Sequence, residues 1–143
     1  MQLVVGGAYA GKRKWVREKF YDAQWFSAYD NQPLAQWEQI YENSSSSIVI
    51  EGWEVWVRQE WEKVKELEPV RKHFESIIAD MKIIEKQRKQ PIVLIMLEVG
   101  RGIVPVDKDE RAWRDLCGWV LQNAAALSEE VHYCWHGLSR QLK

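Results

Sequence analysis

The chain has 143 residues and a nearly balanced charge, with 20 lysines and arginines against 21 aspartates and glutamates. Because no net field would attract polyanions or acidic lipid, we expect no nucleic-acid partner and no membrane partner, and any anion site must be local. The length fits a single domain over residues 1–143. Its two cysteines lack ligand spacing and its start lacks a long apolar segment. These features predict a cytoplasmic protein with free thiols.

The first residues have the pattern of a buried strand followed by a phosphate-binding loop. Leu3-Val4-Val5 leads into Gly6-Gly7-Ala8-Tyr9-Ala10-Gly11-Lys12, which matches the P-loop pattern of two glycines separated by four residues and followed by lysine. In such loops the backbone N–H groups and the positive end of the following helix hold phosphate oxygens, and the lysine reaches the terminal phosphates. We therefore predict that Gly6 to Lys12 bind the phosphates of a nucleotide.

Arg13 departs from this pattern, which has Ser or Thr after the lysine so that a hydroxyl can coordinate Mg²⁺. A guanidinium cannot coordinate a metal ion, although its fixed positive charge can neutralise phosphate by itself. We include Arg13 among the predicted phosphate-binding residues and expect weakened Mg²⁺ binding.

The rest of the chain alternates helical and strand patterns with short connections and no hairpin signal. The continuous apolar run after Pro91 indicates a central strand buried on both faces. We expect an α/β fold of the P-loop NTPase type, with a mainly parallel central sheet flanked by helices. The expected elements are helices from Lys12 to about Ala23, from Pro33 to Tyr41, from Trp53 to Val64, after Pro69 to Ile84 and from about Asp107 to Leu127, and strands at Ile48–Ile50, Ile92–Leu97 and Val131–Trp135.

Two carboxylates follow predicted strands, where parallel sheets place their ligands. Glu51 ends the strand at 48–50 and Glu98 ends the strand at 92–97, so both are expected to share a site with Gly6. Glu51 is the candidate Mg²⁺ ligand, since carboxylate oxygens suit that ion. The alternative for both residues is stabilisation of a neighbouring helix N-terminus.

Other conspicuous residues have less specific interpretations. Nine tryptophans are expected to fill a core or an oligomer interface. Arginines 101, 111 and 114 can hold phosphate or can be solvated or paired with acids. The histidines at 73, 132 and 136 lack ligand spacing, so no metal or catalytic role is expected for them.

The C-terminal third carries a denser set of motifs. It reads Glu-Val-Gly-Arg-Gly-Ile-Val-Pro over 98–105 and Arg-Ala-Trp-Arg-Asp over 111–115, followed by Gly118, Gln122, Glu130-Val131 and Gly137-Leu138. This series resembles the bifunctional adenosylcobinamide kinase/adenosylcobinamide-phosphate guanylyltransferase family. The loop at 6–12 and the segment 48–57 are similar to that family's P-loop and its second conserved strand.

The middle of the chain departs from the family pattern. The family carries a histidine that accepts GMP from GTP in an H-R-x-x-R segment, whereas this chain has no histidine before His73. The region of about 23–47 is reduced, and Tyr29 stands where the resemblance would place a nucleotide-contacting glutamate. Leu97 and Leu121 replace family asparagines, and Glu51 replaces an aspartate.

The resemblance implies a role in cobalamin biosynthesis. It implies binding of GTP or ATP and, at most, phosphoryl transfer to adenosylcobinamide, with guanylyl transfer lost. Lys12 and Glu51 would be catalytic, Glu51 would hold Mg²⁺, and Glu98 would supply a polar contact. A corrinoid would be the second substrate, and a trimer is the expected homo-oligomer. The alternative is a non-catalytic paralogue that serves as a nucleotide-binding or protein-interaction module.

Overall fold

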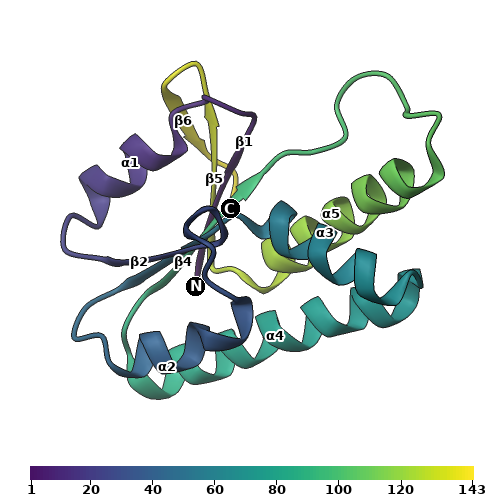
Figure 1. The fold of residues 1–143 in the computed structure, drawn as a ribbon. Coiled ribbons are helices and arrows are strands. Elements are labelled where there is room, and N and C mark those ends of the chain that lie inside the picture. The colour runs from purple at the N-terminus through teal and green to yellow at the C-terminus, as the bar shows by residue number, and fades with distance from the viewer.

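The strands of the computed structural model, which describes residues 1–143, form one six-stranded sheet in the order β2-β3-β4-β1-β5-β6 (Figure 1). The first five strands in this order are parallel, and β6 is antiparallel to β5. The elements are β1 (Gln2–Gly6), α1 (Lys12–Lys19), β2 (Gln24–Ser27), the 3₁₀ turns η1 (Ala28–Asp30) and η2 (Leu34–Gln36), α2 (Trp37–Glu42), β3 (Ile48–Glu51), α3 (Trp53–Val64), α4 (Leu67–Arg88), β4 (Ile92–Leu97), α5 (Lys108–Leu127), β5 (Glu130–Trp135) and β6 (Leu138–Gln141).

The centre of the sheet is apolar on both faces. Leu3 and Val4 of β1 and Val93 and Leu94 of β4 have no exposed surface. Adjacent residues of a strand point to opposite faces, so both faces at this point are covered by other elements. This arrangement explains the unbroken apolar run of β4 and confirms the prediction of a central strand in a mainly parallel α/β sheet.

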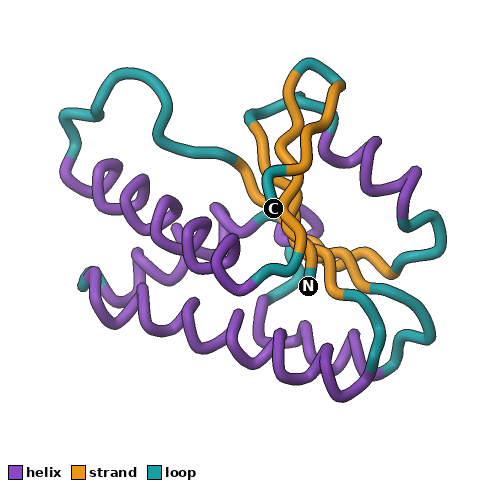
Figure 2. The backbone as a smooth tube through the Cα atoms, turned by 180° about the vertical axis from the view of Figure 1, so that it is seen from behind, coloured by secondary structure: helices purple, strands orange, loops and turns teal.

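The two faces are covered unequally. Figures 1 and 2 show α1 alone on one face, whereas α2, α3, α4 and α5 lie on the other. The helix-rich face contains a core of 27 buried residues, among them Trp53, Phe74 and Leu116, and the face under α1 contains seven, including Val16. Most of the hydrophobic stabilisation therefore comes from the helix-rich face. None of the helices is both long and apolar enough to span a bilayer.

Several predicted boundaries are wrong. The first helix ends at Lys19 and not near Ala23, and β2 begins at Gln24 in a segment for which no strand was expected. Pro69 lies in the first turn of α4, where a missing N–H costs nothing, so it does not separate two helices. The break falls instead at Lys65, whose left-handed backbone (φ 54°) ends α3.

The sheet also ends in a hairpin that was not expected. After β5 the chain turns at His136 and Gly137 and returns as β6, whose four residues are all exposed. The Gly137 N–H donates to the Ala10 carbonyl at 3.0 Å, so this turn supports the glycine-rich loop. Pro33, expected as the first helical residue, precedes η2 as its N-cap.

Candidate functional site: a P-loop cavity at the carboxyl ends of the strands

The glycine-rich loop borders the largest cavity that lies at the carboxyl ends of the parallel strands. Its volume is about 650 Å³, and it is lined by Ala8, Tyr9, Ala10, Gly11, Lys12, Arg13, Lys14, Tyr29, Glu51, Ile95 and Leu97. The loop, the start of α1, the end of β3 and the end of β4 all contribute. The structure thus brings Glu51 together with the loop residues 8–13, and Gly6 ends β1 two residues before Ala8.

Two positions of the loop require glycine for steric reasons. A Cβ atom on Gly6 would lie 2.4 Å from the Cys134 carbonyl oxygen of the neighbouring strand β5. Gly11 has a φ of 100°, and a Cβ there would lie 3.0 Å from the Cα of Gly137. Both glycines let the loop run close to the β5–β6 hairpin, which L-residues with side chains would prevent. The glycines of the sequence motif therefore have a direct packing reason in this fold.

Lys12 folds back over the loop. Its ammonium donates to the Gly7 carbonyl at 2.6 Å and to the Gly6 carbonyl at 3.0 Å. Burial lowers the pKa of Lys12 from its ordinary value, and the acidic groups around it, including Glu54 and Glu51, oppose that shift. Its acceptors are neutral carbonyl oxygens, so an anion in the cavity would compete for the ammonium without breaking an ion pair.

Arg13 forms a two-pronged ion pair with Glu51. The Arg13 Nε donates to Glu51 Oε2 at 2.9 Å, and its Nη2 donates to Oε1 of the same carboxylate. The Ser27 hydroxyl donates to Glu51 Oε1 at 3.0 Å. Glu51 is buried, with 3% of its side chain exposed, whereas half of the Arg13 side chain is exposed. The hydrogen bonds from Arg13 raise its pKa, so this cation is permanent.

These residues do not fit a bound Mg²⁺ ion. Both oxygens of Glu51 already accept hydrogen bonds from Arg13, and a guanidinium stands where a hydroxyl ligand would be needed. The structure contains no group of three or more His, Cys, Asp or Glu side chains arranged to hold a metal. A divalent cation beside Glu51 would also face the positive charge of Arg13 at close range.

Tyr29 covers one side of the ion pair. Its ring centroid lies 5.6 Å from the Arg13 guanidinium carbon, and its hydroxyl donates to Glu54 Oε1. Burial, together with that hydrogen bond, raises the pKa of Tyr29 from its ordinary value. Tyr29 thus stays neutral, and its ring and its hydroxyl, which is hydrogen-bonded to Glu54, line the cavity.

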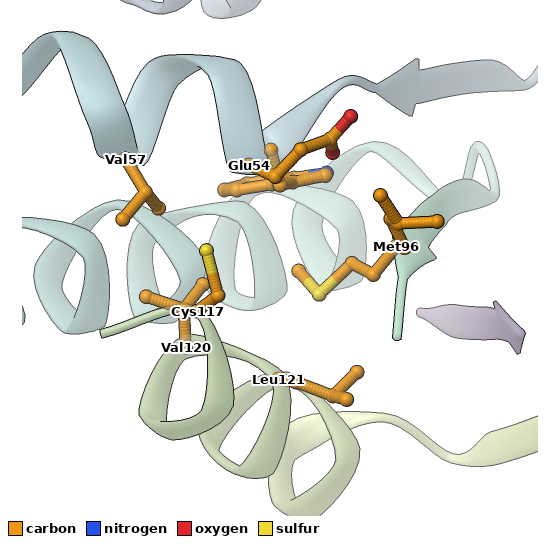
Figure 3. Close-up of a pocket in the computed structure, with 8 residues that line it drawn as sticks. Glu54, Val57, Met96, Cys117, Val120 and Leu121 are labelled. Carbon is orange, nitrogen blue, oxygen red and sulfur yellow. The ribbon is translucent and has the colours of Figure 1, made fainter. Parts of the chain in front are cut away.

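A second, much smaller cavity lies beneath Glu54, as Figure 3 shows. Val57 of α3, Met96 of β4 and Cys117 of α5 converge on it, and its volume is about 10 Å³. This space is near the minimum for one water molecule, so it is a packing gap and not a ligand site. Burial raises the pKa of Cys117 to about 12, which makes that thiol unreactive at neutral pH.

Glu98 does not join the P-loop cavity. Its carboxylate accepts from the Tyr133 hydroxyl at 2.7 Å and from Arg101 Nε at 2.9 Å. It lines a separate, mostly apolar cavity of about 430 Å³ with Val5, Leu121 and other residues. The Glu98 backbone N–H nevertheless donates to the Gly6 carbonyl at 2.9 Å, which ties the end of β4 to the end of β1.

The three arginines near the turn after β4 have protein partners. Arg101 pairs with Glu98, Arg114 donates to the Gly100 and Ile103 carbonyls, and Arg111 donates to the Pro105 and Val106 carbonyls. They hold the long loop that Figure 2 shows projecting between β4 and α5. None of the three histidines lines the P-loop cavity. The His132 ring, for example, packs at a tilt against Trp15, with 4.4 Å between the ring centroids.

Ser27 and Glu54 were missed as site residues by the sequence reasoning. Ser27 ends β2, the strand that was not predicted, and pairs in register with Glu51. Glu54 lies in the first turn of α3, three residues after Glu51. Polar residues next to a strand end were the available signal, but only the order β2-β3-β4 brings them to one edge.

The fold and the loop define a P-loop-like α/β domain, with a mostly parallel sheet and a glycine-rich loop between β1 and α1. Comparison with protein families matches residues 17–142 to the family described as cobinamide kinase/cobinamide phosphate guanyltransferase. The chain therefore belongs to this family. The matched region begins within α1, after the loop itself.

A curated relative agrees with this assignment over a shorter region. The bifunctional adenosylcobalamin biosynthesis protein CobU of Salmonella typhimurium (strain LT2) is 40% identical over 52 residues. This alignment covers 36% of the chain and 29% of the relative. The description of the family names cobinamide kinase and cobinamide phosphate guanyltransferase activities, which are stated here of the family and not of this chain.

Proposed function

We propose that this chain is a nucleotide-binding protein of cobalamin biosynthesis that holds the phosphates of GTP or ATP in the P-loop cavity. The observation that carries the proposal is Lys12, which lines a cavity of about 650 Å³ and whose ammonium donates to the Gly6 and Gly7 carbonyls. The Gly11 N-cap of α1 makes no side-chain hydrogen bond, and the first turn of α1 has no acidic residue, so its N–H groups are available to phosphate oxygens.

Phosphoryl transfer from GTP or ATP to adenosylcobinamide is the most that this site would catalyse. Lys12 and Glu51 both line the cavity, as that reaction would require. Glu51, however, is engaged by Arg13, and without a metal ion phosphoryl transfer lacks an electrostatic stabiliser that contributes several kcal/mol. The non-catalytic alternative, a nucleotide-binding or interaction module, is therefore favoured by the Arg13–Glu51 pair.

Guanylyl transfer is not part of the proposal. It would need a histidine nucleophile close to the bound nucleotide, and none of the chain's histidines lines the cavity. The proposal includes a homo-oligomer, with a trimer as the expectation from the family. Ile103, Val106 and Leu138 are more than 70% exposed, and an interface would cover such apolar side chains. Light scattering that shows a monomer at micromolar concentration would remove the oligomer.

Calorimetric titration with GTP and with ATP tests nucleotide binding. We expect Lys12→Ala to weaken binding at least tenfold, because it removes the lysine that reaches the phosphates. Lys19→Ala is the matched control, since Lys19 ends the same helix and its ammonium lies over Trp15 instead of the cavity. Equal affinities for the wild type and Lys12→Ala would refute the proposal. A parallel assay for phosphorylated adenosylcobinamide would separate a kinase from a non-catalytic protein.

A further inference from the structure

The P-loop cavity carries a strong excess of positive charge from the protein alone. Lys12, Arg13 and Lys14 are consecutive and all line it, and Glu51 is the one carboxylate in the lining. The cations lie in the first turn of α1, where the helix adds further positive potential. The side chains of the protein therefore offer a polyphosphate a cationic surface without a metal ion.

Arg13 is fixed in this position by the burial of its partner. Only 3% of the Glu51 side chain is exposed, and besides Arg13 it has one further donor, the Ser27 hydroxyl. Moving Arg13 away would leave a buried carboxylate without a counter-charge, which is strongly unfavourable. The guanidinium is thus anchored, whether or not a nucleotide is present.

The anchored guanidinium still has donors to offer. Two of its N–H groups bind Glu51, and its remaining N–H groups have no protein partner. Half of the side chain is exposed where it lines the cavity. The buried carboxylate and the exposed guanidinium form a dipole whose positive end lines the cavity, and planar guanidinium groups bind phosphate oxygens well.

We propose that Arg13 takes the place of Mg²⁺ in this chain, so that the site binds the di- or triphosphate of a nucleotide as a metal-free anion and Mg²⁺ weakens binding. This inference rests on the proposed nucleotide binding. Metal-free nucleotide carries more negative charge than its Mg²⁺ complex, and a cavity with three cations and one carboxylate favours the more negative ligand. A bound Mg²⁺ would also compete with Arg13 for Glu51.

The test is calorimetric titration of the whole chain with GTP and with ATP, once with excess EDTA and once with Mg²⁺ in excess of the nucleotide. We expect the dissociation constant to be about tenfold lower in EDTA. Arg13→Ser should weaken nucleotide binding in EDTA about tenfold. In this variant Mg²⁺ should strengthen binding, because the substitution frees Glu51 and supplies a hydroxyl. Arg17→Ser is the matched control, since Arg17 lies on the same helix over Trp25 and does not line the cavity.

Glu51→Gln keeps the test informative if Arg13→Ser does not fold. Glutamine preserves the shape and an acceptor for Arg13 but removes the negative charge, so binding in EDTA should be at least as tight as in the wild type. Binding that needs Mg²⁺ and is lost in Lys12→Ala would overturn the inference and leave nucleotide binding intact. No binding of either nucleotide under either condition would overturn the proposed function, and this inference with it.

Discussion

Adding one methyl group at Gly6 should test the closest contact of the P-loop with the sheet. The Cβ of Gly6→Ala would lie 2.4 Å from the Cys134 carbonyl oxygen, whereas ordinary contact begins at 3.4 Å, so the atoms must separate by about 1 Å. The Cβ position is fixed by the backbone, the carbonyl oxygen is itself a backbone atom, and Gly6 and Cys134 are partners in the parallel β1–β5 pairing. Neither can rotate out of the way.

The expected cost follows from this geometry. Overpacking a close-packed site typically costs 1–3 kcal/mol, and a backbone clash of this size should cost about 2 kcal/mol. For a chain of this length that corresponds to a fall in melting temperature of about 4–8 °C. The same displacement should disturb the Gly6 carbonyl that accepts from Lys12, so nucleotide binding should weaken as well.

Urea denaturation followed by tryptophan fluorescence would measure the effect, with Gly7→Ala as the control. A Cβ on Gly7 meets nothing within 4 Å. Both substitutions reduce the flexibility of the unfolded chain in the same way, so the difference between the two variants isolates the native contact. If their free energies of unfolding agree within about 0.5 kcal/mol, the packing argument for Gly6 is refuted.

Two further predictions concern α5. Asp107→Ala should lower the free energy of unfolding by about 1 kcal/mol, because the Asp107 side chain accepts from the Asp109 and Glu110 N–H groups at the helix start. Urea denaturation would measure this loss. An equal loss in the mid-helix control Asp115→Ala would contradict the capping role of Asp107. The pKa of Cys117 is raised from 9.0 to about 12, so the thiol stays protonated to a higher pH in the folded chain than in the unfolded chain. The free energy of unfolding should therefore fall as the pH rises from about 9 to about 12, and Cys117→Ala should reduce part of this fall. The same pH dependence in the variant would contradict a raised pKa for Cys117.

Local patterns explain why much of the fold could be predicted. The apolar run of β4 and the helical spacing in α3 and α5 report burial directly, because periodicity follows the faces that contact the core. β2 and β6 lack such a signal. β2 is four residues long at one edge of the sheet, and all residues of β6 are exposed, so neither has an alternating apolar pattern to read.

The sequence by itself determined the glycine-rich loop, since Gly6, Gly11 and Lys12 are close in the chain and their spacing fixes the local backbone. Only the tertiary structure decided what surrounds it. Arg13 and Glu51 are 38 residues apart, and the strand order brings them together. Glu98 follows a strand just as Glu51 does, yet it contacts Tyr133 and Arg101 in another cavity. Which cavity a side chain at a strand end lines depends on how distant segments pack around the sheet. Residue spacing along the chain does not contain that information.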